Sequence, residues 1–299
     1  MANEKLERLR HLLASYGSCL VAYSGGVDSV FLAVVAHQVL GAKALAAIAD
    51  SPSLPRREFE EAMSLAQRFG FPVEVVHTQE FENEQYLANP NNRCYFCKHE
   101  LFTELVPLAR ARAFAILAYG ENASDIGDFR PGAQAAAEFQ VRAPLKEVGL
   151  TKSEIRELSA QLGLPTADKP QMACLSSRIP YGEAVSPAKL KMIEQAENIL
   201  RDLGFYDVRV RHHELGAGLG AQARVSTNGS APQAGAVLHL ARIEVGPSEL
   251  PRLIAHGASA EIAAALKKIG YAYATVDLQG YRRGSTNEVL PPAARQNGG

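Results

Sequence analysis

The sequence predicts an α/β protein, in which a parallel sheet has helices on both faces and a smaller α+β domain follows it. Between Cys19 and Pro165, short apolar runs alternate with segments of helical spacing, a pattern typical of parallel sheets with right-handed crossovers. A glycine-rich loop joins the first of these strands to the first helix after it. From Ser186 the expected order changes to helix, strand, strand, helix and strand, which suits a small α+β domain.

The length of 299 residues predicts two domains. We expect the first over residues 1–183 and the second over 184–290, followed by a polar, disordered tail at 291–299. A hydrophobic fraction of 47% and a charged fraction of 21% indicate a globular chain with enough apolar material for a core.

The elements of the first domain are predicted from the spacing of apolar residues. Met1–Tyr16 has leucines at helical spacing among charged residues, which indicates an amphipathic helix rather than a signal peptide. A capping box at Thr151 opens the helix Ser153–Leu162, and Gly163 ends it. The other expected elements are the strands Cys19–Tyr23, Lys43–Ala49, Val73–His77 and Ala115–Tyr119 and the helices Val30–Leu40, Arg56–Phe69 and Lys98–Arg110.

The second domain is expected to begin with a helix from Pro187 to about Leu203. A Gly/Ala-rich loop, Gly216–Gly235, separates its first two strands. The expected strands are Asp207–His213, Val237–Val245 and Tyr271–Asp277, with one or two helices within Pro247–Leu266.

The most informative segment is the loop Ser24–Ser29, which reads Ser-Gly-Gly-Val-Asp-Ser between a strand and a helix. Two glycines let the backbone approach an anion, while the serine hydroxyls and the first helix amides can point at it. The lysine of a Walker A motif is absent. An ordinary glycine-rich turn is the alternative, but the whole motif in this position favours a phosphate site.

This loop resembles the PP-loop of ATP pyrophosphatases. The resemblance implies an adenine nucleotide alpha hydrolase-like fold, Mg²⁺, cleavage of ATP between the α and β phosphates, and transfer of AMP to a substrate. Asp28 and Asp128 are candidate Mg²⁺ ligands. The residues expected to bind ATP are Ala22, Ser24, Gly25, Gly26, Val27, Asp28, Ser29, Asp50, Gly120 and Asn122.

The loop from Gly120 to Arg130 is expected to lie at the same edge of the sheet, because it also leaves the carboxyl end of a strand. Its small residues would let a nucleotide approach the backbone, and Asp125 could bind Mg²⁺ or orient the loop. A surface turn rich in Asn, Asp and Gly is the alternative. PP-loop relatives have other residues at the positions of Glu121 and Ser124, so no role is assigned to these two side chains.

Three of the four cysteines suggest sulfur or cluster chemistry. Cys94 and Cys97 form a C-x-x-C motif just before an expected helix, and Cys174 lies far along the chain. No second C-x-x-C or histidine pair completes a structural zinc site. Three thiolates are enough for a [4Fe–4S] cluster with one open iron, which can hold sulfide. Unrelated buried thiols are the alternative, and Cys19 is expected to be buried in the first strand.

These segments together resemble the LarE family of ATP-dependent sulfur transferases, which act in the synthesis of a nickel-pincer nucleotide. The resemblance rests on the loop, on Asn92–Lys98, on Leu150–Leu164 and on Cys174–Gly182, and it fails mainly at Gly216–Gly235. It implies adenylylation of a carboxylate of a pyridinium mononucleotide and replacement of the carboxylate oxygen by sulfur.

Two types of member are known in this family, and they differ in the source of sulfur. Single-cysteine members sacrifice the sulfur of the cysteine that corresponds to Cys174, whereas three-cysteine members bind a [4Fe–4S] cluster. Cys94, Cys97 and Cys174 make this chain similar to the second type. The resemblance also implies that Arg178 and Glu197 contact the substrate. We expect a homo-oligomer and a source of sulfide as partners.

An arginine pair in the second domain is a candidate substrate clamp. Strict alternation in Asp207–His213 places Arg209, Arg211 and His213 on one face of the expected strand. Two arginines spaced in this way suit the phosphate of a mononucleotide. A solvated sheet face is the alternative, and the resemblance favours the clamp.

Composition limits the other functions to be considered. The net charge of −1 predicts no general attraction to nucleic acid, which weakens the nearest rival, a tRNA thiolation enzyme with a PP-loop and a cluster. A PP-loop amidating ligase would not require three cysteines, and a non-enzymatic nucleotide-binding regulator would bind ATP without releasing pyrophosphate. No apolar run approaches the roughly 18 residues of a membrane span. We therefore expect a cytoplasmic protein, whose cysteines are thiols or metal ligands.

Overall fold

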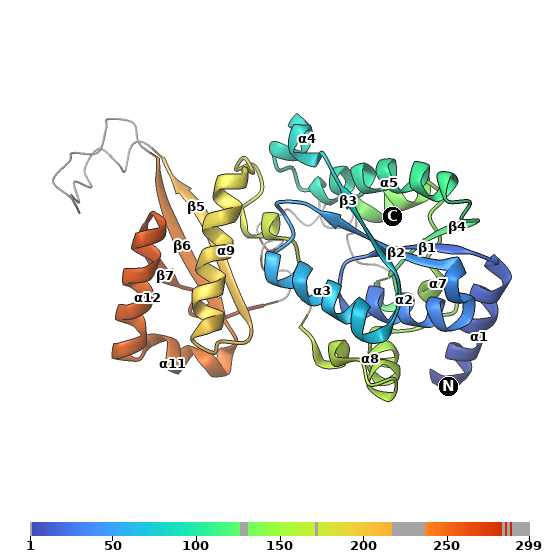
Figure 1. Cartoon of the computed structure of the whole chain (residues 1–299). Helices are drawn as coiled ribbons and strands as arrows, with labels where there is room; N and C mark the ends of the chain where they lie inside the picture. Colours follow the sequence, from blue (N-terminus) through green and yellow to red (C-terminus); the bar gives the residue numbers. More distant parts are fainter. Residues whose placement is uncertain are drawn as a thin grey trace. The chain divides into compact units, whose positions relative to one another are not determined.

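The computed structural model describes residues 2–125, 131–170, 173–216 and 237–282, together with Ser285 and Glu288. The fold has two compact units, which we describe separately (Figure 1). The first comprises residues 1–86 and 91–173, and the second comprises 87–90 and 174–290. The sequence analysis instead placed the boundary after residue 183.

The four-residue segment Leu87–Pro90 belongs to the second unit because of the hydrogen bonds of Asn89. Its side-chain amide donates to the carbonyl oxygens of Pro180 at 2.7 Å and Glu183 at 3.0 Å. Its own carbonyl accepts from the amide of Gly182 at 2.9 Å. Burial removes these backbone groups from water, and the bonds with Asn89 replace the hydrogen bonds that water would have made. The same bonds tie residues 174–183 to Leu87–Pro90.

A four-stranded parallel sheet with the order β3-β2-β1-β4 forms the centre of the first unit. Leu20 and Val21 of β1 are both fully buried although they point to opposite faces of the sheet. This is the burial expected of a parallel sheet that is covered on both sides. The strands are β1 (Cys19–Tyr23), β2 (Ala44–Asp50), β3 (Val73–His77) and β4 (Ile116–Tyr119).

Helices cover both faces of this sheet. The helix α5 (Arg93–Ala111) lies on one face, where Leu105 packs with Leu20. The opposite face is covered by α1 (Ala2–Tyr16), α2 (Val27–Leu40), α3 (Arg56–Phe69) and α8 (Lys152–Gln161), as Figure 1 shows. Shorter helices of this unit are α6 (Pro131–Glu138) and α7 (Pro144–Glu147), and α4 (Glu84–Leu87) ends at the first residue of the segment that belongs to the second unit.

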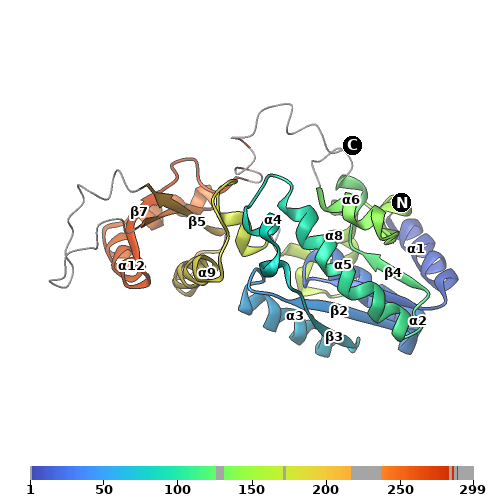
Figure 2. The ribbon, with the colours of Figure 1, turned by 90° about the horizontal axis from the view of Figure 1, so that it is seen from above.

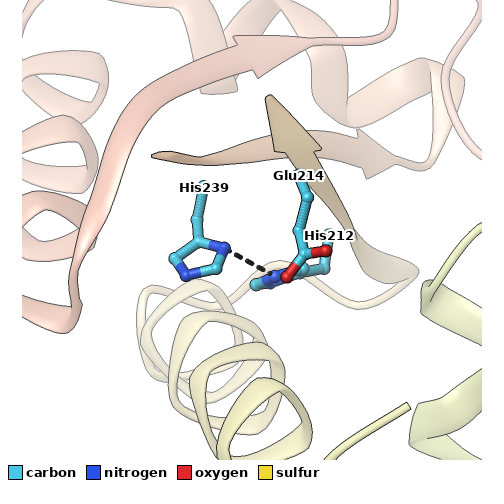
Figure 3. Close-up of side chains that lie close together, drawn as sticks. All are labelled: His212, Glu214 and His239. Carbon is cyan, nitrogen blue, oxygen red and sulfur yellow. Dashed lines mark hydrogen bonds between the residues drawn. The ribbon is translucent and has the colours of Figure 1, made fainter. Parts of the chain in front are cut away.

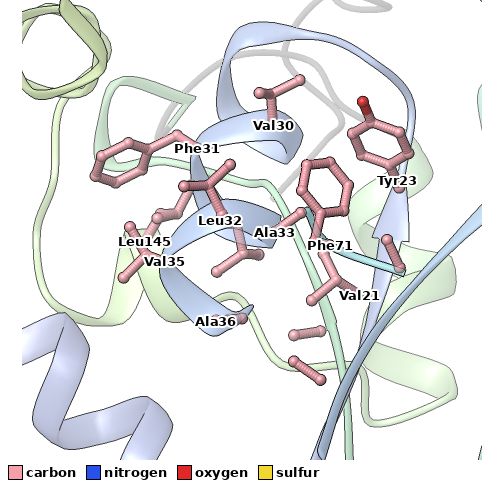
Figure 4. Packing of buried hydrophobic residues seen from close by; sticks show 14 of the residues in the cluster. Val21, Tyr23, Val30, Phe31, Leu32, Ala33, Val35, Ala36, Phe71 and Leu145 are labelled. Carbon is pink, nitrogen blue, oxygen red and sulfur yellow. The ribbon is translucent and has the colours of Figure 1, made fainter. Parts of the chain in front are cut away.

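The helix α2 forms the centre of the larger core (Figure 4). Every residue from Ser29 to Ala36 is buried, so the helix is apolar nearly all round rather than on one stripe. It packs against β1 and β2 on one side and against α1 and α8 on the other. This complete burial fixes the position of the loop that precedes the helix.

The second unit is a three-stranded sheet with the order β5-β6-β7, and two helices lie side by side on one face (Figure 2). Strands β5 and β6 are antiparallel, whereas β6 and β7 are parallel. The core lies between the sheet and α9 and α12. The elements are α9 (Pro187–Asp202), β5 (Val208–Leu215), β6 (Leu238–Val245), α11 (Leu250–Ile254), α12 (His256–Ile269) and β7 (Tyr271–Val276).

The predicted fold class is confirmed, and most elements lie within two residues of their expected bounds. The capping box at Thr151 is present, since its hydroxyl accepts from the amide of Glu154 and the Glu154 carboxylate accepts from the amide of Thr151. One expectation was wrong: the C-x-x-C motif lies inside the first turns of α5 rather than before the helix. Cys, Tyr and Phe are weak helix formers, so the sequence pattern placed the start at Lys98.

Several predicted features lie outside the described residues. These are Asp128, nearly all of the insertion Gly216–Gly235 and the tail at 291–299. Within the described part of the chain, no helix combines the length and the apolar character that are needed to cross a membrane.

We predict that Leu266→Ala lowers the free energy of unfolding of the second unit by about 2–5 kcal/mol, the range for a large-to-small change in a core. Leu266 of α12 is fully buried in this core. The matched control is Leu278→Ala, because Leu278 is 89% exposed and its loss should change stability by less than about 0.5 kcal/mol. Urea unfolding of the two variants measures the difference, and equal effects would contradict the described packing.

Candidate functional site

The loops predicted to bind ATP leave the same edge of the first unit's sheet. Ser24, Ser51 and Gly120 follow β1, β2 and β4, and these strands are parallel neighbours. Their carboxyl ends therefore meet at one edge, which is where open α/β sheets bind their ligands.

The Ser24–Ser29 loop has the local geometry of an anion cradle. Gly25 has φ +70°, a left-handed conformation that favours glycine, and a methyl group there would lie 2.7 Å from the Cβ of Ala62. Gly26 is the N-cap of α2, and no side chain caps the helix there. The hydroxyls of Ser24 and Ser29 are 3.1 Å apart, and that of Ser29 donates to the Gly26 carbonyl at 3.1 Å. The loop thus presents backbone amides and serine hydroxyls together.

The start of the Gly120 loop packs directly against this cradle. A Cβ at Gly120 would lie 3.0 Å from the amide nitrogen of Ser29 and 3.2 Å from the Cβ of Asp28, so a larger residue would push the two loops apart. The side chain of Asn122 is buried, and the Asp125 carboxylate accepts from the amide of Asn122 at 3.1 Å. Asp125 therefore orients the loop, which was one of its two expected roles.

Two lysines that the sequence analysis did not identify flank the cradle. Lys152 Nζ lies 2.6 Å from Asp28 Oδ2, and it joins the start of α8 to the first turn of α2. Lys169 Nζ contacts Glu58 at 2.7 Å and Glu61 at 2.9 Å. Burial alone would lower the pKa of Lys169, but the two carboxylates outweigh it and raise the pKa. The position of Lys152 inside a capping box indicated a helix start and gave no sign of this contact.

The end of β2 carries a second polar cluster. Asp50, predicted to bind ATP, forms an ion pair with Arg56 at 2.6 Å. Beyond it, the buried hydroxyls of Ser51 and Ser53 are 2.8 Å apart. The Ser51 hydroxyl donates to the buried carboxylate of Glu80, which follows β3. The cluster holds the β2 and β3 ends together beside the cradle.

Glu121, to which the sequence analysis assigned no role, is a buried member of the Gly120 loop. Its carboxylate accepts from the Tyr119 hydroxyl and pairs with Lys146 at 3.0 Å. Burial would raise the pKa of Glu121, but these two donors lower it. Lys98, one residue after the C-x-x-C motif, lies over the Tyr119 ring with its Nζ 4.5 Å from the ring centroid. This network links the loop to α5.

The C-x-x-C cysteines share one face of α5, because they are three residues apart on the helix. Cys94 is exposed and Cys97 is partly buried. Cys19 is fully buried in β1, and burial raises the pKa of its thiol to about 12. Cys94 and Cys97 are therefore accessible to a metal or cluster, whereas Cys19 is not.

Cys174 belongs to the second unit, where it begins the turn that carries Arg178. The Arg178 guanidinium is fully buried and forms a bidentate pair with Glu197 of α9, at 2.8 and 3.1 Å. It also donates to the Cys174 carbonyl at 3.0 Å. Burial would lower the pKa of Arg178, but the charge of Glu197 outweighs it and raises the pKa. Arg178 and Glu197, which the family resemblance singled out, are thus direct partners.

The predicted clamp arginines lie on β5 next to that turn. Arg211 makes a bidentate pair with Glu244 of β6, at 3.0 and 2.8 Å, and donates to the Ser177 carbonyl at 3.0 Å. The guanidinium of Arg209 lies 4.8 Å from the ring centroid of Tyr281. Both arginines are buried, with exposed fractions of 4% and 6%. The alternative of a solvated sheet face is therefore wrong.

The buried cluster has an excess of positive charge. Its members are Arg178, Arg209 and Arg211, together with Glu197 and Glu244, so three cations face two carboxylates. Burial and the neighbouring Arg178 lower the pKa of Arg209, since a second positive charge nearby disfavours its charged form. Such an excess favours an anionic ligand.

The residues predicted to bind ATP therefore gather at one edge of the sheet of the first unit. Cys94 and Cys97 belong to the same unit. Cys174 and the four predicted substrate-binding residues gather in the second unit. Ala22, in β1, and Val27, at the start of α2, flank the loop itself.

This parallel sheet and its loop define a PP-loop protein of the ATP-using kind. The sequence model of the NAD synthase family matches residues 3–126, which is the part that contains the cradle and β1 to β4. One subunit of the glutamine-hydrolyzing GMP synthase of Methanopyrus kandleri is 25% identical over 67% of this chain and 67% of its own length.

Two further relatives match nearly the whole chain. An uncharacterized protein of Synechocystis is 42% identical over 97% of this chain and 99% of its own length. The pyridinium-3,5-bisthiocarboxylic acid mononucleotide synthase of Lactiplantibacillus plantarum is 30% identical over 91% of this chain and 90% of its own length. The chain therefore belongs to the LarE family of PP-loop proteins.

We predict that Gly25→Ala destabilises the first unit, because it forces a side chain into a left-handed conformation and against Ala62. Strain of this kind costs about 1–3 kcal/mol. Gly26→Ala is the matched control, since Gly26 has φ −81° and a Cβ there would meet only Ser24 Oγ at 3.5 Å. Thermal unfolding should separate the two variants, and a Gly25→Ala protein as stable as the control would contradict the loop geometry.

Proposed function

We propose that the chain is an ATP-dependent sulfur transferase that converts a carboxylate of a pyridinium mononucleotide into a thiocarboxylate. The observation that carries the proposal is the relation to the Lactiplantibacillus plantarum synthase over nine-tenths of both chains. The relation includes the second unit, in which a cysteine turn adjoins a buried arginine cluster. In this setting, the product would enter the synthesis of a nickel-pincer nucleotide.

The first half of the reaction activates the carboxylate. A carboxylate oxygen attacks the α-phosphorus of ATP, an acyl adenylate forms, and pyrophosphate leaves. The amides of the Ser24–Ser29 loop and the start of α2 would hold the pyrophosphate, because a helix N-terminus stabilises anions. Asp28 fits a Mg²⁺ ion shared with the phosphates, since Mg²⁺ binds through one or two carboxylates and substrate phosphates.

The second half of the reaction replaces oxygen by sulfur. Sulfide sulfur attacks the acyl carbon, AMP leaves with the former carboxylate oxygen, and the thiocarboxylate remains. The adenylate makes this possible because AMP is a much better leaving group than oxide. Water must be excluded, since it would hydrolyse the adenylate to the starting carboxylate and AMP.

The arginine cluster of the second unit supplies the affinity for the mononucleotide phosphate. Arg178 and Arg211 are held in place by Glu197 and Glu244, so their positions are fixed before the substrate arrives. The excess positive charge of the cluster would then attract the phosphate.

The cysteines would hold the sulfur source. Cys94 and Cys97 lie on one face of α5, Cys94 exposed and Cys97 partly exposed, which fits two thiolate ligands of a cluster. We propose that Cys174 is the third ligand, so that a [4Fe–4S] cluster has one open iron that supplies the sulfide. Direct donation of the Cys174 sulfur is the alternative.

The test is an assay of anaerobically purified protein with ATP, Mg²⁺, sulfide and a pyridinium mononucleotide that carries ring carboxylates. We expect AMP, pyrophosphate and a product in which sulfur replaces oxygen, as read by mass spectrometry. Asp28→Ala should reduce pyrophosphate release by about 100-fold or more, the size of effect when a charge-stabilising group is lost. Asp202→Ala, at the exposed end of α9, is the matched control.

Two outcomes of that assay would contradict the proposal. Formation of ADP and phosphate would show that ATP is cleaved at another bond. With ammonia offered beside sulfide in a parallel reaction, formation of an amide in place of the thiocarboxylate would indicate an amidating ligase, an activity suggested by the name of the glutamine-hydrolyzing relative.

We further predict that Cys94→Ser, Cys97→Ser and Cys174→Ser each lose most of the iron that the unaltered protein takes up on anaerobic reconstitution. Loss of one of three thiolate ligands leaves the cluster with too few. Cys19→Ala should keep full iron content, because Cys19 is buried in β1. Iron analysis and absorption spectra measure the effect, and a Cys174→Ser protein with full iron would remove Cys174 from the ligand set.

A further inference from the structure

A group of side chains that could bind a metal lies in the second unit, on the face of β5 opposite to Arg209 and Arg211. His212 and Glu214 share one face of β5, because they are two residues apart on a strand. His239 of β6 pairs directly with Glu214 across the antiparallel ladder. Figure 3 shows the three side chains converging above α9.

The distances between their ligand atoms suit one metal ion. The ligand atoms of the three residues all lie within 4.8 Å of one another, and His212 Nε2 is 3.1 Å from His239 Nδ1 (Figure 3). Two imidazole nitrogens on a tetrahedral zinc ion lie roughly 3.3 Å apart, since each is about 2.0–2.1 Å from the metal. The contact also requires that one of the two nitrogens carries no proton, as a metal ligand must.

The hydrogen-bond partner of His212 also supports a metal site. The other nitrogen of His212, Nδ1, is 3.1 Å from the hydroxyl of the buried Tyr271. Metal-binding histidines usually have such a partner, which fixes the ring and its tautomer.

The local charge favours a cation as well. Glu214 pairs with Lys189 through one carboxylate oxygen, at 2.9 Å, and its backbone amide donates to the carboxylate of Glu183 at 3.2 Å. These two carboxylates and one ammonium group carry a net charge of −1, which attracts a cation.

We propose that His212, Glu214 and His239 bind a divalent transition-metal ion, with zinc as the best fit. Two imidazoles and a carboxylate are the ligands that zinc shares with cobalt and nickel. Three protein ligands leave a fourth position for water or another small ligand. The site is independent of the proposed function, because it uses neither the cysteines nor the arginine cluster.

The test uses Co²⁺ as a spectroscopic probe on the full chain with Cys94, Cys97 and Cys174 replaced by Ser, so that no other accessible thiol can bind it. The protein is first freed of metal by dialysis against a chelator. We expect one Co²⁺ per chain, visible absorption typical of four-coordinate cobalt, and loss of this absorption when one equivalent of Zn²⁺ is added.

The ligand variants distinguish this site from a hydrogen-bonded histidine pair that only supports the core. His239→Ala and Glu214→Gln should weaken Co²⁺ binding by about 100-fold or more, since even an outer partner of a metal ligand is worth 10–100-fold. His239→Cys should restore binding and add a thiolate-to-cobalt absorption band. The matched control is His213→Ala, because His213 points to the opposite face of β5.

Circular dichroism and thermal unfolding establish that each variant is folded before it is titrated. Stoichiometric binding that depends on His239 and Glu214 but not on His213 supports the site. Absence of stoichiometric binding, or binding that His239→Ala leaves unchanged, would overturn the proposal and leave the pair as a structural contact.

Discussion

The complete burial of α2 is the constraint on which the first unit depends. Because every residue from Ser29 to Ala36 is covered, the helix cannot rotate or slide without exposing apolar surface at about 25 cal/mol per Å². Its N-terminus is therefore held at one place relative to β1 and β4, and Gly120 packs against it. The position of the anion cradle is thus a consequence of core packing, and the glycines of the loop permit its local conformation.

The second unit differs from the first in that its interior contains a cluster of charged side chains. Removing a guanidinium and a carboxylate from water costs several kcal/mol, and only close bidentate pairing offsets this cost. The Arg178–Glu197 and Arg211–Glu244 pairs meet that condition. Replacing one partner alone would leave an uncompensated buried charge, so these positions are coupled. The pairs align rigid guanidinium groups beside the turn of Cys174, which suits recognition of an anion better than stability.

Sequence reasoning predicted the fold class, the four parallel strands and the order of the second unit, because apolar periodicity depends on burial alone. It also located the loops, since Ser24–Ser29 and the Gly120 segment are adjacent to strand ends. It could not give the partners of side chains that lie far apart in the chain. Lys152 meets Asp28 only where α8 packs against α2, and Arg211 meets Glu244 only through the pairing of β5 with β6. The His212–His239 contact depends in the same way on strand register, which the single sequence did not fix.

The placement of Leu87–Pro90 has a consequence for how the chain folds as it is synthesised. This segment is synthesised before most of its own unit. Asn89 can form its hydrogen bonds to Pro180 and Glu183 only after these two residues, about 90 residues later in the chain, have been synthesised. A gene divided after Ala173 would consequently leave the second fragment without Asn89, which binds the carbonyls of Pro180 and Glu183. The two units are therefore separate compact units whose segments are interleaved along the chain.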